Sequence, residues 1–275
     1  MARADSPGAD DGDRLGALFP EGDYRFRATL RRSDPRDFFR PQDPTGRVLA
    51  ERARWVAEEP ARYATLEPEG APLLAEFSDL TRRWNLPGAE NVHALATSFE
   101  PDILLLSLDR KGAFRLRGGA LCFPTGWALE KKIGRTMDVV HAPVPGLNRA
   151  LAPAIQQVMA KLKPGVAFLR ENWGLVATDE LNLHPSRHVA PPALPVALDR
   201  LWLRVEYQAL VKLPQTDGVA FGIRIALHRL DQVARHPASV QLRRSLVSMP
   251  AEVAAYKRIE TVRADVVRLL ESSWS

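Results

Sequence analysis

His141 is the residue whose type and position first suggest chemistry. It follows the mostly apolar run 136–140 and precedes Ala142-Pro143. Because a proline disfavours the α conformation in the residue before it, a helix through this run should end at about His141. An imidazole at a helix end among apolar neighbours can bind a metal or the iron of a cofactor. The same residue could instead satisfy its hydrogen bonds in the wall of the core.

A second group of polar side chains lies on two consecutive predicted strands, 201–213 and 219–227. Strand alternation puts large apolar residues on one face of the second strand and only small residues with Arg224 on the other. If the loop between the strands closes symmetrically, Gln208 faces Arg224 and Glu206 lies diagonal to it. The three side chains would then border a floor cleared for a flat ligand. The alternative is a solvent-exposed face with a cross-strand ion pair, and a shift of one residue in register would separate the groups.

The elements that must position these residues predict an α+β fold. Apolar spacing indicates helices over most of 46–84, and three short apolar runs separated by turn residues predict a β-meander. A helical stretch follows, and its last helix ends at Pro164-Gly165. Three longer strands complete the core, and the chain returns to helix from Leu230. The strands are predicted at 103–108, 113–116, 120–123, 166–176, 201–213 and 219–227.

Composition limits the class of protein. The chain has 275 residues, of which 45% are apolar, and its net charge of +5 comes from basic residues interspersed with acidic ones. Nucleic-acid binding is therefore not expected, whereas an acidic partner or a cofactor's carboxylates would suit the charge. The single Cys122 excludes an internal disulfide framework. We expect a disordered tail at 1–15, a single domain over 16–275, no membrane segment and a cytoplasmic location.

A series of short motifs in the same chain order resembles the heme-dependent oxidative N-demethylase alpha-subunit-like family. The resemblance covers roughly 46–257, and the motifs are individually short. They are Phe123-Pro-x-x-Trp127, Lys132-Ile-Gly134, His141-x-Pro-Val-Pro145, Arg170-Glu-Asn-Trp173, Arg204-Val-Glu-Tyr-Gln208, Leu213-Pro214, Phe221-Gly-Ile-Arg224 and Ser248-Met-Pro250.

The resemblance implies a PAS-like domain that binds heme b. Its core would span about 99–228, with an antiparallel sheet, helices on one side, and helical extensions at both ends. The implied activity is that of a monooxygenase: oxidative N-demethylation of a small secondary amine with molecular oxygen. A separate NADPH-dependent reductase with flavin and an iron–sulfur cluster would supply the electrons. This chain has no dinucleotide-binding glycine motif, and one cysteine cannot hold a cluster.

The resemblance also implies roles for individual residues. His141 would be the proximal ligand of the heme iron, and Arg224 would donate to bound oxygen. Glu206 would hold the amine as its ammonium form or accept its proton, and Gln208 would orient either group.

Further basic and aromatic residues are candidates for holding the cofactor. Arg170, Lys132 and Arg135 could bind the heme propionates, or they could be solvated charges. Trp173 is expected to pack against the heme or the core. Two other functions stay open, a PAS-type heme sensor of gas or redox state and a non-catalytic heme-binding protein. Tyr207 stands where the family pattern leads us to expect a charged residue, and this leaves the amine unspecified.

Overall fold

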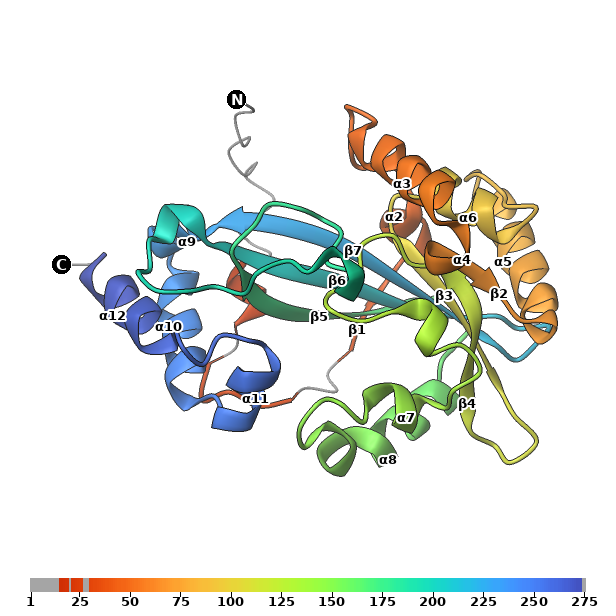
Figure 1. Cartoon of the computed structure of the whole chain (residues 1–275). Coiled ribbons are helices and arrows are strands. Elements are labelled where there is room, and N and C mark those ends of the chain that lie inside the picture. The colour runs from red at the N-terminus through yellow and green to blue at the C-terminus, as the bar shows by residue number, and fades with distance from the viewer. Residues whose placement is uncertain (1–14, 20, 27–29, 274–275) are drawn as a thin grey trace.

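The computed structural model describes residues 15–19, 21–26 and 30–273, and its centre is one antiparallel sheet (Figure 1). The seven strands lie in the order β1-β5-β6-β7-β3-β4-β2. Neighbours in this order pair antiparallel throughout. Their bounds are β1 Arg31–Ser33, β2 Ala64–Leu66, β3 Asp102–Leu108, β4 Phe114–Ala120, β5 Ala167–Val176, β6 Trp202–Lys212 and β7 Val219–Arg229.

Helices lie before, between and after these strands, and the fold is α+β, as predicted. Prolines begin or interrupt the N-terminal helices: Pro60 is the first residue of α4, and Pro72 lies in the first turn of α5. The bounds are α2 Pro35–Phe39, α3 Arg47–Glu58, α4 Pro60–Tyr63, α5 Ala71–Arg83, α6 Val92–Ser98, α7 Met137–His141, α8 Leu147–Ala160, α9 Leu230–Ala234, α10 Ala238–Ser248, α11 Ala251–Tyr256 and α12 Arg263–Ser272. Short 3₁₀ helices occupy Pro68–Gly70 (η1), Leu129–Lys131 (η2), Pro185–Arg187 (η3) and Leu198–Arg200 (η4).

The two faces of the sheet are covered by different helices, and we name each face after one helix that lies on it. The α7 face carries Phe168, Leu210 and Ile223, which pack in one apolar cluster with residues of α8 such as Met159. The α3 face carries Ala209, among others, and packs against α2 to α6. Residues of the C-terminal helices α9 to α12, such as Val253 of α11, pack in one cluster with Leu203 and Val205, which lie on the α3 face at its other end. The helices between β4 and β5 therefore lie on one side, as expected, and the N-terminal helices cover the opposite side.

The long strands begin and end close to where the sequence predicts them, but the β3–β4 region differs. Gly118 and Gly119 do not separate two strands; they lie inside β4 with φ of 149° and 143°. A Cβ on Gly119 would overlap the backbone of Ile103 in the neighbouring strand. The glycines therefore allow the two strands to approach closely and do not form a turn. The separate strand predicted at 120–123 is not found among these described residues, because β4 continues to Ala120 and ends there.

The hairpin between β6 and β7 has a register that differs by one residue from the predicted one. Lys212 pairs with Val219, and Leu213 N donates to the Gly218 carbonyl at 2.9 Å, so the loop has four residues instead of five. Asp217 adopts a left-handed conformation with φ of 57°. Arg224 consequently pairs with Tyr207, and Gln208 pairs with Ile223. The predicted pairing of Gln208 with Arg224 is wrong.

A glutamate from an N-terminal helix fixes this loop. The carboxylate of Glu76 in α5 accepts hydrogen bonds from Gln215 N at 2.6 Å and from Thr216 N at 2.8 Å. The hydroxyl of Thr216 donates to the same carboxylate at 2.6 Å. The loop conformation thus depends on a distant tertiary contact.

Most of the predicted tail, 1–14, lies outside the described residues. Leu15 is buried in the cluster with the C-terminal helices, which corrects its assignment to the tail. Within the described residues, no helix combines the length and apolar character needed to cross a bilayer.

Candidate functional site

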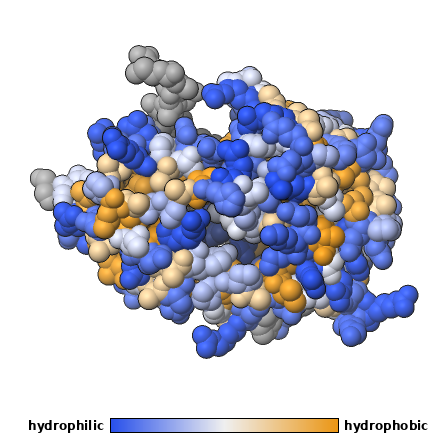
Figure 2. Space-filling view, in the orientation of Figure 1, coloured by the Kyte–Doolittle hydropathy of each residue, from blue (hydrophilic) through white to orange (hydrophobic). Residues whose placement is uncertain are grey.

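The candidate site lies on the α7 face, where the long strands β5 and β6 pair. Arg170 is opposite Gln208, and Asn172 is opposite Glu206 in the antiparallel register. Directly opposed residues of paired strands point to the same face, so all four side chains share this face. In the view of Figure 1, Figure 2 shows the molecule hollowed near its centre, between the C-terminal helices and α7–α8, with hydrophilic residues in and around the hollow.

Glu206 is the centre of a hydrogen-bond network although only 9% of the residue is exposed. Its Oε1 accepts from the hydroxyl of Thr125 at 2.6 Å. Its Oε2 accepts from Nε2 of Gln208 at 2.7 Å and from Nδ2 of Asn172 at 3.2 Å. Three donors that point at two oxygens suit an acceptor-only carboxylate, and they fix the orientation of its plane.

Two buried cations support this network from outside. Arg204, 1% exposed, donates from Nε to the Thr125 hydroxyl at 3.0 Å and from Nη2 to the carbonyls of Phe123 and Leu181. Burial lowers the pKa of Arg204 to about 10, and the nearby Glu206 opposes this effect.

Lys257, which follows α11, lies at the other side of the network. Its ammonium donates to the Trp173 carbonyl and to Oδ1 of Asn172, the latter at 3.4 Å. Burial lowers the pKa of Lys257 to about 8, against the opposite effect of Glu206. Asn172 is thereby held between an ammonium and a carboxylate, with its amide nitrogen directed to Glu206.

Arg170 links this network to His141. The Nε of Arg170 is buried and has no hydrogen-bond partner among the described residues. Burial lowers the pKa of Arg170, while the charges of Glu206 and Glu171 raise it. A buried guanidinium nitrogen without a partner is costly in an isolated protein and suits a site that receives an anionic or acceptor group from a ligand.

His141 is the last residue of α7, as predicted from Pro143. Burial lowers the pKa of its imidazole to about 4, and the charges of Arg170 and Lys132 act in the same direction. The imidazole is therefore neutral near pH 7, the form that binds metals. Lys132 also donates to the Val140 carbonyl at 3.4 Å and so contacts the last turn of α7. Electrostatic effects link His141 to Lys132 and Arg170, and link Arg170 to Glu206, while Gln208 contacts Glu206 by a hydrogen bond.

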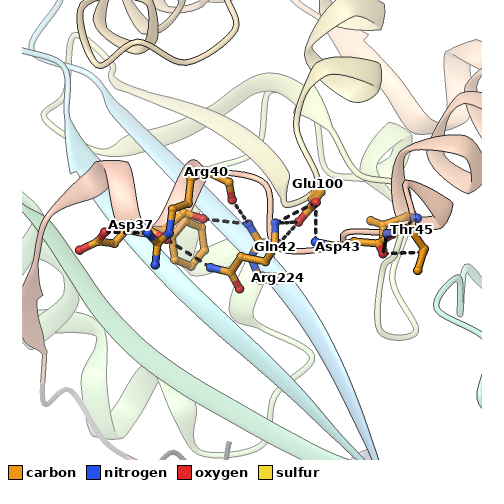
Figure 3. A network of polar contacts seen from close by, with 9 residues as sticks. Asp37, Arg40, Gln42, Asp43, Thr45, Glu100 and Arg224 are labelled. Atoms are coloured by element: carbon orange, nitrogen blue, oxygen red, sulfur yellow. Dashed lines mark hydrogen bonds and ion pairs between the residues drawn. The ribbon is translucent and has the colours of Figure 1, made fainter. Parts of the chain in front are cut away.

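Arg224 does not share this face, and this corrects the predicted cluster. Because it is opposite Tyr207 in the ladder, it points to the α3 face. There it forms an ion pair with Glu100 and donates to the carbonyls of Phe38 and Arg40 (Figure 3). The Glu100 side chain is only 3% exposed. We conclude that Arg224 anchors the N-terminal segment to β7.

The floor of small residues expected beside Arg224 is occupied by aromatic rings. A Cβ on Gly222 would lie 2.5 Å from the Phe38 ring and 3.0 Å from the Phe39 ring. Gly222 therefore accommodates α2, and this part of the row is not the cleared floor that the sequence led us to expect. The large apolar residues of β7, Ile223 and Ile225, instead border the polar row of β6.

Trp173 also lies away from the Arg170 side chain. It is next to Asn172 in β5, so its side chain points to the other face, where its ring packs edge-on against Phe19 with centroids 5.2 Å apart. Sequence reasoning did not select Thr125, Asn172 or Lys257. Strand parity could have found Asn172, which is two residues from Arg170, whereas no local signal marks Thr125 or Lys257.

A separate cavity of about 550 Å³ lies between the sheet and the N-terminal segment. Its lining includes Tyr207, Arg224 and Phe38, and it shares Arg170 and Gln208 with the site described above. Neither His141 nor Glu206 lines it. The cluster of titratable groups therefore defines the candidate site better than this cavity does.

The match to known families agrees with the site. The model of the family described as "Haem-dependent oxidative N-demethylase, alpha subunit-like" matches residues 65–267. This is most of the chain, and the protein belongs to that family. The family's name indicates a heme-dependent oxidoreductase with partner subunits. The observed residues fit such a cofactor: a neutral imidazole stands with two cations, one of which has a buried nitrogen without a partner.

Proposed function

We propose that the protein is a monooxygenase that carries out heme-dependent oxidative N-demethylation of a small secondary amine. The balanced reaction joins the N-methyl amine, molecular oxygen, two electrons and two protons, and yields the demethylated amine, formaldehyde and water. NADPH would supply the electrons through a separate reductase with flavin and an iron–sulfur cluster. The observation that carries the proposal is a hydrogen-bonded carboxylate, Glu206, on the same face as the neutral His141 and the cations beside it.

His141 is the residue we assign to the iron of heme b. A neutral imidazole has one nitrogen lone pair that can bind iron, and burial keeps His141 neutral near pH 7. His141 is the last residue of α7. Heme, when bound, supplies an iron that binds and activates oxygen. Arg170 and Lys132 are assigned to the propionates, because guanidinium and ammonium groups pair with carboxylates. The core 99–228, with two strands, helices and a three-stranded meander in chain order, supports a PAS-like fold.

Glu206 is the residue we assign to the amine. A secondary amine is an ammonium ion near neutral pH, and a carboxylate with fixed orientation can hold it by a charge-assisted hydrogen bond. The same oxygen, Oε2, can accept the amine proton when the nitrogen must be neutral. Gln208 and Asn172 keep Oε2 in place through their amide nitrogens, so binding requires little reorganisation.

The first test is a hemin titration of the purified protein followed by its Soret band. The parent should bind one equivalent with a sharp band. His141→Ala should shift or lose the band, or bind at least about tenfold more weakly. His93→Ala, at an exposed histidine of α6, is the matched control and should behave as the parent does. Unchanged spectra in His141→Ala would refute the assignment of the iron ligand.

The second test separates amine binding from heme binding. Dimethylamine, the simplest secondary amine with an N-methyl group, should perturb the heme spectrum of the loaded parent. Glu206→Gln should retain heme and bind dimethylamine at least about tenfold more weakly, because the ionic hydrogen bond is lost. Glu171→Gln, on the same sheet but the opposite face, should change amine affinity by less than about twofold. Equal affinities in Glu206→Gln and parent would refute the role of this carboxylate.

A further inference from the structure

The segment that covers the α7 face is much more basic than the rest of the chain. Residues 109–163 contain ten Lys and Arg residues against three Asp and Glu residues, whereas the whole chain has 38 against 33. The excess of positive charge in the whole protein thus comes from this segment. It contains β4, η2, α7 and α8.

The acidic residues of this segment do not neutralise its exposed cations. Asp109 forms an ion pair with Arg115, and Glu130 contacts His184. The remaining acid, Asp138, is exposed on α7. Seven exposed cations of this segment have no ion pair within the part of the chain that the structure describes. One is Arg149 in α8, and the other six are Arg110, Lys111, Lys131, Arg135, Lys161 and Lys163.

The fold places five of these six cations at one end of the sheet, and the sixth, Lys131, lies in η2, which precedes α7 in the chain. Arg110 and Lys111 lie between β3 and β4, and Lys161 and Lys163 lie between α8 and β5. β3 ends where β4 begins, and β5 begins at the same end because Ala167 pairs with Val211 near the end of β6. Arg135 lies beside the start of β4, since its carbonyl accepts from Leu116 N at 3.0 Å.

Two large apolar side chains are exposed among these cations. Val139 on α7 is 44% exposed and Leu108 at the end of β3 is 40% exposed. Val139 precedes His141 by two residues, or about 3 Å along the helix axis. Exposed apolar residues within a polar surface whose charges all have the same sign are typical of a protein-binding site.

We infer that this basic surface, formed by the six cations with Val139 and Leu108, docks an acidic protein that delivers electrons. The inference rests on the proposed function, because that reaction consumes two electrons and this sequence has no dinucleotide-binding motif and no cysteine set for an iron–sulfur cluster that would supply them. Its position explains the choice of partner: a protein docked on α7 would lie within one helical turn of the residue assigned to the iron. Opposite charge on the partner would speed encounter and fix its orientation.

The probe for this inference is a plant-type [2Fe–2S] ferredoxin, a small acidic iron–sulfur protein, carrying a fluorescent label. Its binding is measured by anisotropy on both heme-free and heme-loaded protein, at about 20 mM and about 200 mM salt. We expect binding at low salt that weakens at least about tenfold at high salt, because exposed charges are screened beyond the Debye length.

Charge reversal locates the surface. Lys111→Glu combined with Lys131→Glu should weaken ferredoxin binding at least about tenfold at low salt. Arg47→Glu combined with Arg83→Glu changes net charge equally at exposed sites on α3 and α5, and should weaken binding by less than about threefold. An equal effect of the two pairs would overturn the inference, since it would show attraction by net charge alone.

Two further outcomes are decisive. Absence of ferredoxin binding at low salt would overturn the inference. Vesicles containing phosphatidylserine test the other anionic surface: if the Lys111 and Lys131 reversals weaken vesicle binding but not ferredoxin binding, the protein-partner assignment is wrong. Heme uptake is read separately from the Soret band, so a protein that binds ferredoxin but no heme would refute the proposed function and leave the docking surface standing.

Discussion

Replacing Arg224 with alanine tests the assignment of this residue to the fold instead of the reaction. In the folded protein its guanidinium pairs with Glu100, whose side chain is 3% exposed, and donates to the carbonyls of Phe38 and Arg40. Glu100 also accepts from the backbone nitrogens of Gln42 and Asp43. Arg224→Ala therefore leaves a buried carboxylate without its cation and two carbonyls without a donor.

The expected cost of this change is large. Removing one partner of a buried ion pair costs about 3–5 kcal/mol, and we take the lower end because the backbone donors to Glu100 remain. For a chain of 275 residues the unfolding entropy is about 0.6 kcal/mol/K, so a loss of about 3 kcal/mol lowers Tm by about 5 °C. Heme affinity should change by less than about twofold, since the guanidinium lies on the opposite face from His141.

The measurement combines thermal and urea unfolding, followed by circular dichroism, with the hemin titration. Arg229→Ala, on the same strand, breaks a surface pair with Asp231 and should leave Tm nearly unchanged. Adding Glu100→Gln to Arg224→Ala should restore part of the lost stability, because the unpaired charge is removed. An unchanged Tm in Arg224→Ala, or a loss of oxygen binding at unchanged Tm, would refute the structural role.

Two more predictions concern packing and the buried thiol. Gly222→Val should lower the free energy of unfolding by about 1–3 kcal/mol, because its side chain would enter the Phe38 and Phe39 rings. Gly174→Ala, where a Cβ meets nothing within 4 Å, should be tolerated; equal effects of the two in urea unfolding would contradict this packing. Burial raises the pKa of Cys122 to about 12, so at pH 9 iodoacetamide should label the folded thiol at least about a hundredfold more slowly than the unfolded one. Since the unfolded thiol ionises first, this group also makes stability fall as pH rises from 9 to 12; rapid labelling at pH 9 under native conditions would show that the thiol is accessible.

Local pattern was enough to predict the long strands and the helix that ends at His141. The apolar alternation of β6 and β7 defined the two faces of each strand correctly. Pro143 fixed the end of α7, because its effect on the preceding residue is local. The shared face of Glu206 and Gln208 follows from their spacing within one strand.

Relations between elements could not be predicted in the same way. The pairing of β6 with β7 depends on the loop that Glu76 holds, and a shift of one residue moved Arg224 to the other face. The alternation of small and large residues along β7 also predicted open space beside Gly222, whereas the aromatic rings of α2 occupy that space. Lys257, which follows α11, contacts Asn172 85 positions earlier in the chain, and no pattern along the sequence indicates such a contact.

The grip of Glu76 on the β6–β7 loop also bears on how the chain acquires its shape. The carboxylate and the loop amides are 139 and 140 positions apart. These hydrogen bonds therefore form only when α5 and the β6–β7 hairpin have come together. Such distant closure slows folding relative to chains stabilised by neighbours. A fragment that began at β3 would retain every strand from β3 to β7 but would lack Glu76, whose carboxylate holds the β6–β7 loop in the conformation that sets the strand register.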